Sequence, residues 1–453
     1  MYKYRHRERA IWLQGAVASA VFGLLLVGAA SAPAQAESIR SEQWYLDDMH
    51  AEEMWKVSTG KGVTVAVVDT GVDPTNPDLV GRILPGKDFA PGSPGDEQTD
   101  YDGHGTGMAG LIAGTGAYGG GRGAFGLAPG AKILPIRIPD LKDANSMGEL
   151  ATKSNPVFAK AIRYAADHDA QVINVSQELM RGSSELTEAV KYALGKGSLI
   201  FASVGDSGDT NNILNYPSAT PGVVGVGAVN KDIFASGTSQ KGEQVDISAP
   251  GVDMVHACGG KTGFCKTAGT GDATALASAS AALIWAKHPG WTNNQVLRVL
   301  LNTIGGPTDG AKRNAAIGYG VVRPRIALKK IGDPGPAGKY PLPDFPVAEV
   351  IKYPSPKASG AATSTAAKES DNNAPLGIGI GIGAAVLIGA GVAVPLVRRR
   401  QRRVTQPPPP MPPYVPSRPQ HPAYAPLPSS NYYSPGSPSN GQQGPEVRRP
   451  TEP

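Results

Sequence analysis

Cysteine is almost absent from this chain: its 453 residues include only Cys258 and Cys265. Two cysteines without a second pair are a poor signal for a zinc site. The two lie close together in the sequence and would close a short loop if they bonded. In an oxidising compartment we expect a Cys258–Cys265 disulfide, with two free thiols as the alternative.

The central part of the chain also lacks a strong charge of either sign. The formal net charge is +5, from 43 Lys and Arg against 38 Asp and Glu. The basic excess lies at the extreme N-terminus and in the arginine cluster at residues 398–403. A nucleic-acid-binding domain usually carries a basic face, so we expect no nucleic-acid partner.

The N-terminus carries a secretion pattern. Basic residues within the first nine positions precede an apolar run over 16–30, which ends in the small-x-small sequence Ala34-Gln35-Ala36. This pattern is typical of a secretory signal peptide over residues 1–36. An uncleaved membrane anchor is the alternative, but the apolar run is short for a span.

The C-terminal third carries a membrane-anchoring pattern. Residues 333–375 are rich in Pro, Ala, Ser and Lys and predict an extended linker. Residues 376–397 contain no charge and are long enough to cross a bilayer as a helix. The arginines that follow predict a cytoplasmic, disordered tail over 398–453. We therefore expect a single-pass protein of the cell membrane with its N-terminal domain outside the cytoplasm.

Between these ends, strand and helix patterns alternate. Apolar runs with no polar face predict parallel strands buried on both sides. They lie at residues 62–68, 132–138, 172–176, 199–203, 223–229 and 245–248, with helices predicted at 156–167, 185–196, 271–283 and 292–302. This succession implies βαβ units, hence an α/β domain over 37–332: a mostly parallel twisted sheet with helices on both faces.

Two polar residues stand where such a sheet collects its chemistry. Asp69 directly follows the first strand, and catalytic groups of open α/β sheets gather at the carboxyl ends of strands. His104 lies between glycines at the start of an apolar helix pattern, which leaves its imidazole little steric cover. We expect both side chains to face one site. The alternative for His104, a satisfied structural histidine, does not explain this placement.

The stretch at residues 267–283 is a glycine-rich turn that opens an alanine-rich helix. Such a turn usually presents a nucleophile, with the first amides of the helix pointing at the site. The residue at the apex is Gly271, which has no side chain.

These segments resemble the motifs of the subtilisin-like serine peptidases. Residues 67–72 are similar to the family's aspartate motif and residues 102–106 to its histidine motif. Weaker matches lie at residues 126–129, 172–176, 216–217 and 249–251. The signal peptide, linker and C-terminal span also resemble the mycosins, the membrane-anchored subtilases associated with type VII secretion. The resemblance implies a subtilisin-like fold and an Asp69–His104–serine relay, in which His104 deprotonates the serine and Asp69 orients the imidazole.

The chain departs from that pattern at three positions. Gly271 stands where the family has its nucleophilic serine, and loss of one relay member costs on the order of a million-fold in turnover. Asp206 stands where an asparagine donates to the oxyanion, so an ionised carboxylate would repel the developing charge, whereas a protonated one could still donate. In the substrate-binding segment Ser176-Gln177-Glu178, Glu178 replaces a small glycine and should crowd or repel the peptide.

Four nearby hydroxyls are possible substitutes for the missing serine. Ser278 lies about 10 Å of helical rise beyond Gly271, and Ser280 lies farther still. Thr270 precedes the apex, and Thr274 is one helical turn inside. We expect none of them to replace it.

The sequence predicts no metal site and leaves calcium open. Asp96, Glu97, Asp100 and Asp102 lie in one acidic loop, but their spacing does not match an EF-hand, and solvated carboxylates are the commoner case.

The sequence therefore predicts a mycosin-like subtilase homologue that has lost peptidase chemistry and keeps a binding or scaffolding role. Its expected partners are a secreted polypeptide or membrane components of a secretion system. One alternative is an active subtilisin-type endopeptidase with an unrecognised nucleophile. Another is a module that holds extended peptides in the substrate cleft that the resemblance implies.

Overall fold

A computed structural model describes residues 38–345, apart from residue 91 and the segments 141–146 and 261–262. Side chains at 147–153 are also left undescribed. The predicted signal peptide, the membrane span at 376–397 and the tail lie outside the described residues. Within the described part, no helix is both long and apolar enough to cross a membrane.

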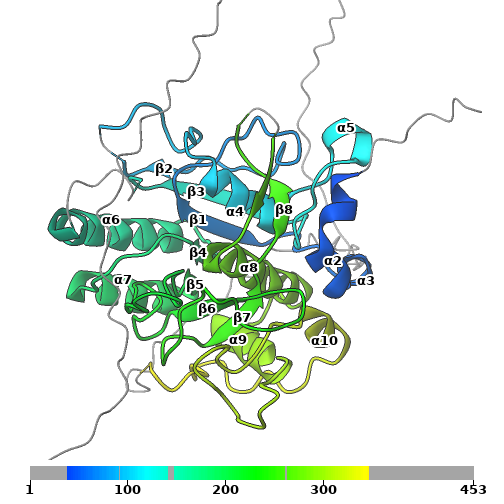
Figure 1. Ribbon diagram of the computed structural model, residues 1–453, viewed down its shortest axis with the longest axis vertical. Coiled ribbons are helices and arrows are strands. Elements are labelled where there is room, and N and C mark those ends of the chain that lie inside the picture. The colour runs from blue at the N-terminus through cyan, green and yellow to red at the C-terminus, as the bar shows by residue number, and fades with distance from the viewer. Residues whose placement is uncertain (1–37, 91, 141–146, 261–262, 346–453) are drawn as a thin grey trace, which may run out of the picture. The chain divides into compact units, whose positions relative to one another are not determined.

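Seven parallel strands form one sheet in the order β2-β3-β1-β4-β5-β6-β7 (Figure 1). The strands are β1 (Thr64–Asp69), β2 (Lys87–Asp88), β3 (Lys132–Arg137), β4 (Val172–Val175), β5 (Leu199–Ser203), β6 (Val224–Val229) and β7 (Ile247–Pro250). Strands β4 to β7 are buried along their whole length. Their uninterrupted apolar runs reflect this burial on both faces.

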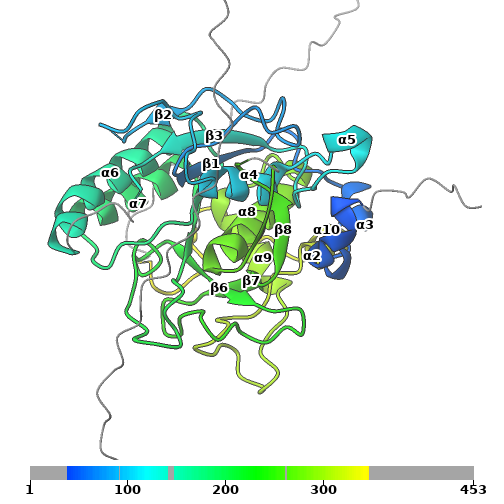
Figure 2. The same cartoon turned by 45° about the horizontal axis from the view of Figure 1, so that its top comes forward.

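Helices cover both faces of the sheet. The helical elements are η1 (Ile39–Glu42), α2 (Trp44–Asp48), α3 (Ala51–Trp55), α4 (His104–Ala113), α5 (Tyr118–Gly121), α6 (Met147–Asp167), α7 (Ser184–Lys196), α8 (Thr270–Lys287), α9 (Asn293–Asn302) and α10 (Pro324–Lys329). Helix α4 packs against α8, and α6 packs against α7. The two pairs lie on different sides of the sheet (Figures 1 and 2). The predicted α/β architecture is confirmed.

Helix α8 is the centre of the domain. Every residue from Thr270 to Trp285 is buried, and the helix packs against α4 and against strands β4 to β7. Its many alanines let neighbouring backbones approach closely. A helix enclosed on all sides holds its first turn in a fixed place. That first turn carries Gly271.

The predicted start of α6 was wrong. We placed it at Pro156, but the helix begins at Met147 and contains Pro156 in its interior. Helices α7 and α9 begin within one residue of their predicted starts. The capping box of α9, formed by Thr292 and Gln295, is present.

Three strands were not predicted. Besides the two-residue β2, an antiparallel hairpin joins β8 (Met254–Ala257) to β9 (Phe264–Thr267) just before α8. Cys258 and Cys265 form a disulfide in this hairpin, with Cα atoms 5.8 Å apart. The hairpin therefore leads into α8 with its two strands covalently joined.

The first part of the predicted linker packs on the domain. Tyr340 and Leu342 are buried, and the Tyr340 hydroxyl donates to the Gly222 carbonyl over 2.9 Å. Arg298 on α9 donates to the Pro334 carbonyl over 2.7 Å. The folded unit therefore continues to at least residue 345, beyond the predicted boundary at 332.

Candidate functional site

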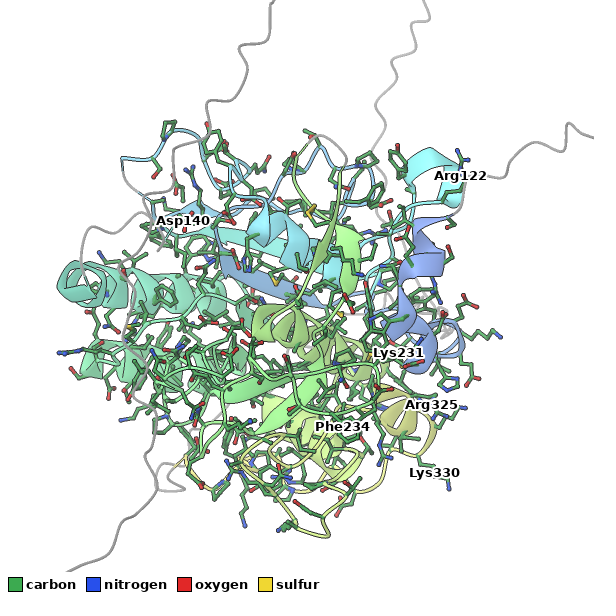
Figure 3. All side chains as sticks on the ribbon, in the orientation of Figure 1. Arg122, Asp140, Lys231, Phe234, Arg325 and Lys330 are labelled. Carbon is green, nitrogen blue, oxygen red and sulfur yellow. A yellow bond between two sulfur atoms is a disulfide. The ribbon has the colours of Figure 1, made fainter. Side chains whose placement is uncertain are left out.

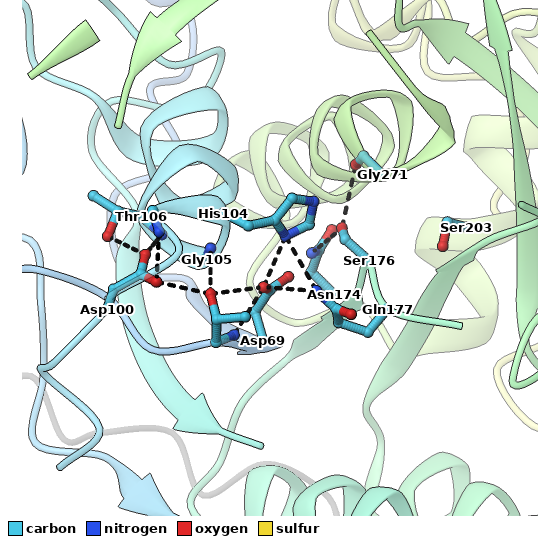
Figure 4. A network of polar contacts seen from close by, with 12 residues as sticks. Asp69, Asp100, His104, Gly105, Thr106, Asn174, Ser176, Gln177, Ser203 and Gly271 are labelled. Carbon is cyan, nitrogen blue, oxygen red and sulfur yellow. Dashed lines mark hydrogen bonds and ion pairs between the residues drawn. The ribbon is translucent and has the colours of Figure 1, made fainter. Parts of the chain in front are cut away.

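Asp69 and His104 meet at the carboxyl edge of the sheet. Asp69 is the last residue of β1 and is completely buried, while His104 is the first residue of α4. The imidazole Nδ1 lies 2.8 Å from the Asp69 Oδ1 (Figure 4). Because Nδ1 faces the carboxylate, Nε2 points away from it, toward the start of α8. This is the orientation that a general base of a serine peptidase needs.

Thr70 and Asp100 bind the two segments into one unit. The Thr70 hydroxyl donates to Asp100 Oδ1 over 2.8 Å and accepts from the Gly105 amide over 3.0 Å. Asp100 also accepts hydrogen bonds from the Gly103 amide and from both the amide and the hydroxyl of Thr106. These bonds satisfy amides at the start of α4 that have no partner within the helix.

Two other carboxylates of the acidic loop accept hydrogen bonds from nearby groups of the chain. Asp96 accepts from the Gln98 amide and the Thr99 hydroxyl, and Glu97 accepts from the Gly86 amide. No group of three or more His, Cys, Asp or Glu residues is arranged to hold a metal within the described part of the chain. Burial raises the Asp100 pKa against the opposing effect of its hydrogen bonds.

The surroundings of His104 favour its charged form. Burial alone would lower its pKa, but the charge and hydrogen bond of Asp69 outweigh burial, and Asp272 and Asp102 add to them. The resulting pKa is about 9, although 32% of the side chain remains exposed. The imidazole is therefore protonated at neutral pH and a poor base there.

Gly271 occupies the position that faces His104. A Cβ built on Gly271 would lie 3.6 Å from His104 Nε2 and 3.3 Å from the Ser176 Cβ. A hydroxyl on that Cβ would fall within hydrogen-bond reach of Nε2. Gly271 has ordinary helical backbone rather than a left-handed conformation. The backbone conformation therefore does not require glycine at position 271.

Asp206 follows β5 and caps the first turn of α8. Its Oδ1 accepts from the Thr270 amide over 3.0 Å, and its Oδ2 lies 2.9 Å from where a Cβ on Gly269 would be. Burial of the carboxylate raises its pKa, whereas the hydrogen bonds from Thr270 lower it. Its outer atoms are exposed to solvent. An acceptor already bound to the helix therefore stands where the resemblance requires an oxyanion donor.

Glu178 turns toward the carboxyl end of β5. Its Oε1 accepts from the Ser203 hydroxyl over 2.7 Å. Burial raises the Glu178 pKa to about 7, and the nearby charge of Asp206 adds to this. Two acidic groups thus share the region that the resemblance assigns to the substrate, and neither has an ion pair among the described residues.

Ser176 and Gln177 contact residues of the site. The Ser176 hydroxyl donates to the Gly271 carbonyl over 3.2 Å. The Gln177 amide donates to Asp69 Oδ1 over 3.3 Å and lies 3.4 Å from His104 Nδ1 (Figure 4). Both residues thus hydrogen-bond to groups around His104, and their role in lining a substrate path stays a prediction.

The four possible substitute hydroxyls are engaged elsewhere. Thr274 and Ser280 each donate to the carbonyl four residues earlier in α8. Ser278 is buried and donates to Asn174 Oδ1 over 3.0 Å. Thr270 Oγ1 accepts from the Gly205 amide over 3.1 Å. A nucleophile must present a free hydroxyl to its base. Among the described residues, none of these four hydroxyls forms a hydrogen bond with His104.

Sequence reasoning missed a buried polar chain behind the site. The Thr267 hydroxyl donates to Asp272 Oδ2 over 2.7 Å and also lies 2.8 Å from His256 Nε2. The other imidazole nitrogen, Nδ1, lies 2.9 Å from the Ala257 carbonyl. Burial raises the Asp272 pKa to about 7 and lowers the His256 pKa to about 4. The only sequence signal for this buried polar chain was the position of Asp272 beside Gly271.

The comparisons with known proteins agree with this geometry. The model of the subtilase family matches residues 60–320, more than half of the chain. The chain belongs to the subtilase family. Subtilisin BL of Lederbergia lenta is 34% identical over 245 residues, which cover 54% of this subtilase and 84% of the relative. Subtilisin E of Bacillus subtilis is 34% identical over 240 residues, 52% of this chain and 59% of the relative.

Solved mycosin structures are also similar to this subtilase. MycP1 of Mycobacterium smegmatis matches with a TM-score of 0.57 and 28% identity, covering 68% of this chain and 89% of that one. The MycP3 protease from the type VII (ESX-3) secretion system matches with a TM-score of 0.54 and 31% identity, covering 63% and 88%. The subtilase is therefore structurally close to the MycP proteases.

Proposed function

We propose that this subtilase is a membrane-anchored, mycosin-like protein that works beside a type VII secretion system and has lost acyl-enzyme chemistry. It keeps a binding or scaffolding role outside the cytoplasm. The similarity to the MycP structures supports the association with secretion. The uncharged segment at 376–397 and the arginines after it support the anchor and its orientation. Its partners would be a secreted polypeptide or membrane components of the secretion system.

One observation supports the proposed loss of peptidase chemistry: the Cβ position of residue 271 faces His104 Nε2, and glycine has no hydroxyl there. The empty Cβ position lies 3.6 Å from Nε2. The neighbouring groups oppose the reaction further, because the imidazole is already protonated at neutral pH and Asp206 offers an acceptor where a donor is needed.

An active serine endopeptidase that processes secreted proteins is the second candidate. It is favoured by the 2.8 Å contact between Asp69 and His104, which is the working half of a relay. The same contact also belongs to the hydrogen-bonded unit that starts α4, so it has a structural reason to persist. A module that binds extended peptides in the cleft is a third candidate, distinguished from scaffolding by saturable peptide binding.

Labelling of the full-length protein by a fluorophosphonate probe tests the proposal. We expect no labelling of the native chain. We expect labelling of the Gly271→Ser variant, because its hydroxyl would lie within reach of Nε2, and labelling should increase above pH 9, where His104 loses its proton. The Gly271→Ala variant adds a Cβ without a hydroxyl and should stay unlabelled.

The double variant Gly271→Ser with His104→Ala is the control for the relay. Its labelling should fall to that of Gly271→Ala. Labelling of the native protein that disappears on His104→Ala would contradict the proposal, and the modified residue would identify the substitute nucleophile.

A further inference from the structure

A second concave site lies at the far edge of the sheet, beyond β7. It is a pocket of about 280 Å³ with a mainly apolar lining. Met49, Pro250, Val321, Val322 and Pro324 form much of its wall. In the order of the sheet, β7 is four strands from β1, which is about 19 Å at the usual strand spacing. The pocket is therefore separate from the Asp69–His104 site.

A strained loop places Ile233 in the lining of the pocket, with Phe234 next to it in the chain. Ile233 lines the pocket, is 50% exposed and has a φ of 65°, a conformation that is unfavourable for a β-branched residue. Phe234 beside it is 70% exposed. Asn230 fixes the turn, because its side-chain oxygen accepts from the Phe234 amide and its own amide donates to the Phe234 carbonyl. Backbone strain that keeps apolar groups in water points to a binding role.

The rim of the pocket carries basic side chains. Arg323 and Arg325 line it, and Lys231 lies in the strained loop. None of the three forms an ion pair with a carboxylate within the described part of the chain. Lys231, Phe234 and Arg325 lie on the same face of the molecule, with Lys330 close to Arg325 (Figure 3). Three acidic groups lie nearby: Asp48 lines the pocket, Asp232 lies in the strained loop, and Glu53 interacts electrostatically with Arg325.

We propose that this edge pocket docks a segment of a partner protein. The segment inserts one large apolar side chain between Ile233, Val322 and Pro324 and presents flanking carboxylates to Lys231 and Arg325. A volume of this size accepts a leucine, phenylalanine or tryptophan side chain, the usual anchors of protein interfaces. The proposal rests on the scaffolding role and supplies a contact surface for it. It does not depend on whether the Asp69–His104 site is catalytically active.

The mixed charge of the rim favours a protein segment over a lipid surface. An anionic bilayer attracts a basic face as a whole, and Asp48 and Asp232 would lie against its headgroups. A peptide places its carboxylates individually beside Lys231 and Arg325 and leaves the two aspartates in solvent. A deep apolar pocket also selects a single side chain, which a flat membrane does not provide.

Photocrosslinking of the full-length protein in its native membrane tests the proposal. The variant Phe234→p-benzoylphenylalanine should crosslink to one protein, and mass spectrometry of the joined peptide should show a large apolar residue flanked by Asp or Glu. Adding Gly306→Trp, which fills the pocket, should reduce the yield about tenfold or more. A Cβ on Gly306 meets no atom closer than 3.9 Å, so the variant should fold.

Matched controls separate the possible outcomes. Gly290→Trp introduces the same side chain at an open position and should leave the yield unchanged. The same crosslinker at Val80, which is 63% exposed, should not capture the same partner. Crosslinks to lipid alone, to a second copy of this chain alone, or to nothing would overturn the proposal, as would a yield that Gly306→Trp does not change.

A defined probe gives the charge dependence. The purified full-length chain should bind a fluorescent acidic peptide with a central tryptophan saturably and should bind its lysine-substituted copy at least about tenfold more weakly. Arg325→Glu should reverse this preference, and Arg122→Glu, on a distant part of the same face, should not (Figure 3). Equal binding of both peptides would contradict the proposal. Because the fluorophosphonate test reports only on the cleft, its failure and the failure of this proposal are distinguishable.

Discussion

The two sides of the cleft differ in what their residues do for the fold. On one side, Asp69, Thr70, Asp100 and His104 form a connected hydrogen-bond network that also caps α4. On the other, Gly271 contributes no side chain and Asp206 presents a carboxylate to the first turn of α8. The first side has the arrangement of a working relay, and the second lacks both the nucleophile and the expected donor.

The difference shows which parts of a relay are also structural. Removing Asp100 or Thr70 would leave amides at the start of α4 without partners, so these residues are held by stability as well as by chemistry. Gly271 needs no side chain for α8 to form, because the surrounding helix is already fully buried. The helix therefore does not depend on a side chain at position 271.

The largest effect is expected when the nucleophile and the oxyanion donor are both restored on the second side of the cleft. In the Gly271→Ser background, Asp206→Asn should raise kcat/KM for a chromogenic peptide by roughly 10²–10³, because an amide donor replaces an acceptor beside the developing oxyanion. The control is Asp209→Asn, which removes an exposed charge from the same loop and should change little. If Asp206→Asn gives no gain, the oxyanion position has been assigned to the wrong residue.

A smaller effect is expected on stability, where one substitution on each side of the cleft shows how much that side contributes to the free energy of unfolding. Asp100→Ala should reduce the free energy of unfolding by about 2–3 kcal/mol, since it removes a half-buried charged acceptor of several hydrogen bonds. Asp206→Ala should cost about 1 kcal/mol, as expected for an exposed helix cap. Thermal unfolding of the detergent-solubilised chain measures both. Equal losses would show that both sides support the fold to the same degree.

The last comparison concerns the pH dependence contributed by His104. Its folded pKa of about 9 lies above the ordinary value of 6.5, so its charged form stabilises the fold fully below about pH 6.5 and loses that effect as the pH rises through 9. The difference in melting temperature between the native chain and His104→Gln should therefore shrink over this range. Histidine NMR gives the pKa directly, and a value near 6.5 would contradict the assigned environment.

Much of the sheet was predictable because burial leaves a simple pattern. The run at 199–203 matches β5 residue for residue, and the predicted β4 and β6 differ from the observed strands by one residue at one end. The hairpin β8–β9 was missed because each of its strands has only four residues, which do not alternate between polar and apolar. Helix α6 was predicted too short because a proline inside a helix resembles a proline at its start.

The site was predictable where a motif fixes it and not where long-range packing does. The positions of Asp69 and His104 followed from local segments. The contact of Gln177 with Asp69, and the chain from Asp272 through Thr267 to His256, depend on how β4 and the hairpin sit against α8. That register is set by tertiary packing, which a single sequence does not display.

The link between Thr70 and Asp100 also has a consequence for recognising such proteins in genomes. Because these two side chains make the aspartate and histidine segments a single structural unit, the segments can survive in lineages that no longer cut peptide bonds. A survey that scores those segments alone would register neither Gly271 in the first turn of α8 nor Asp206 after Gly205.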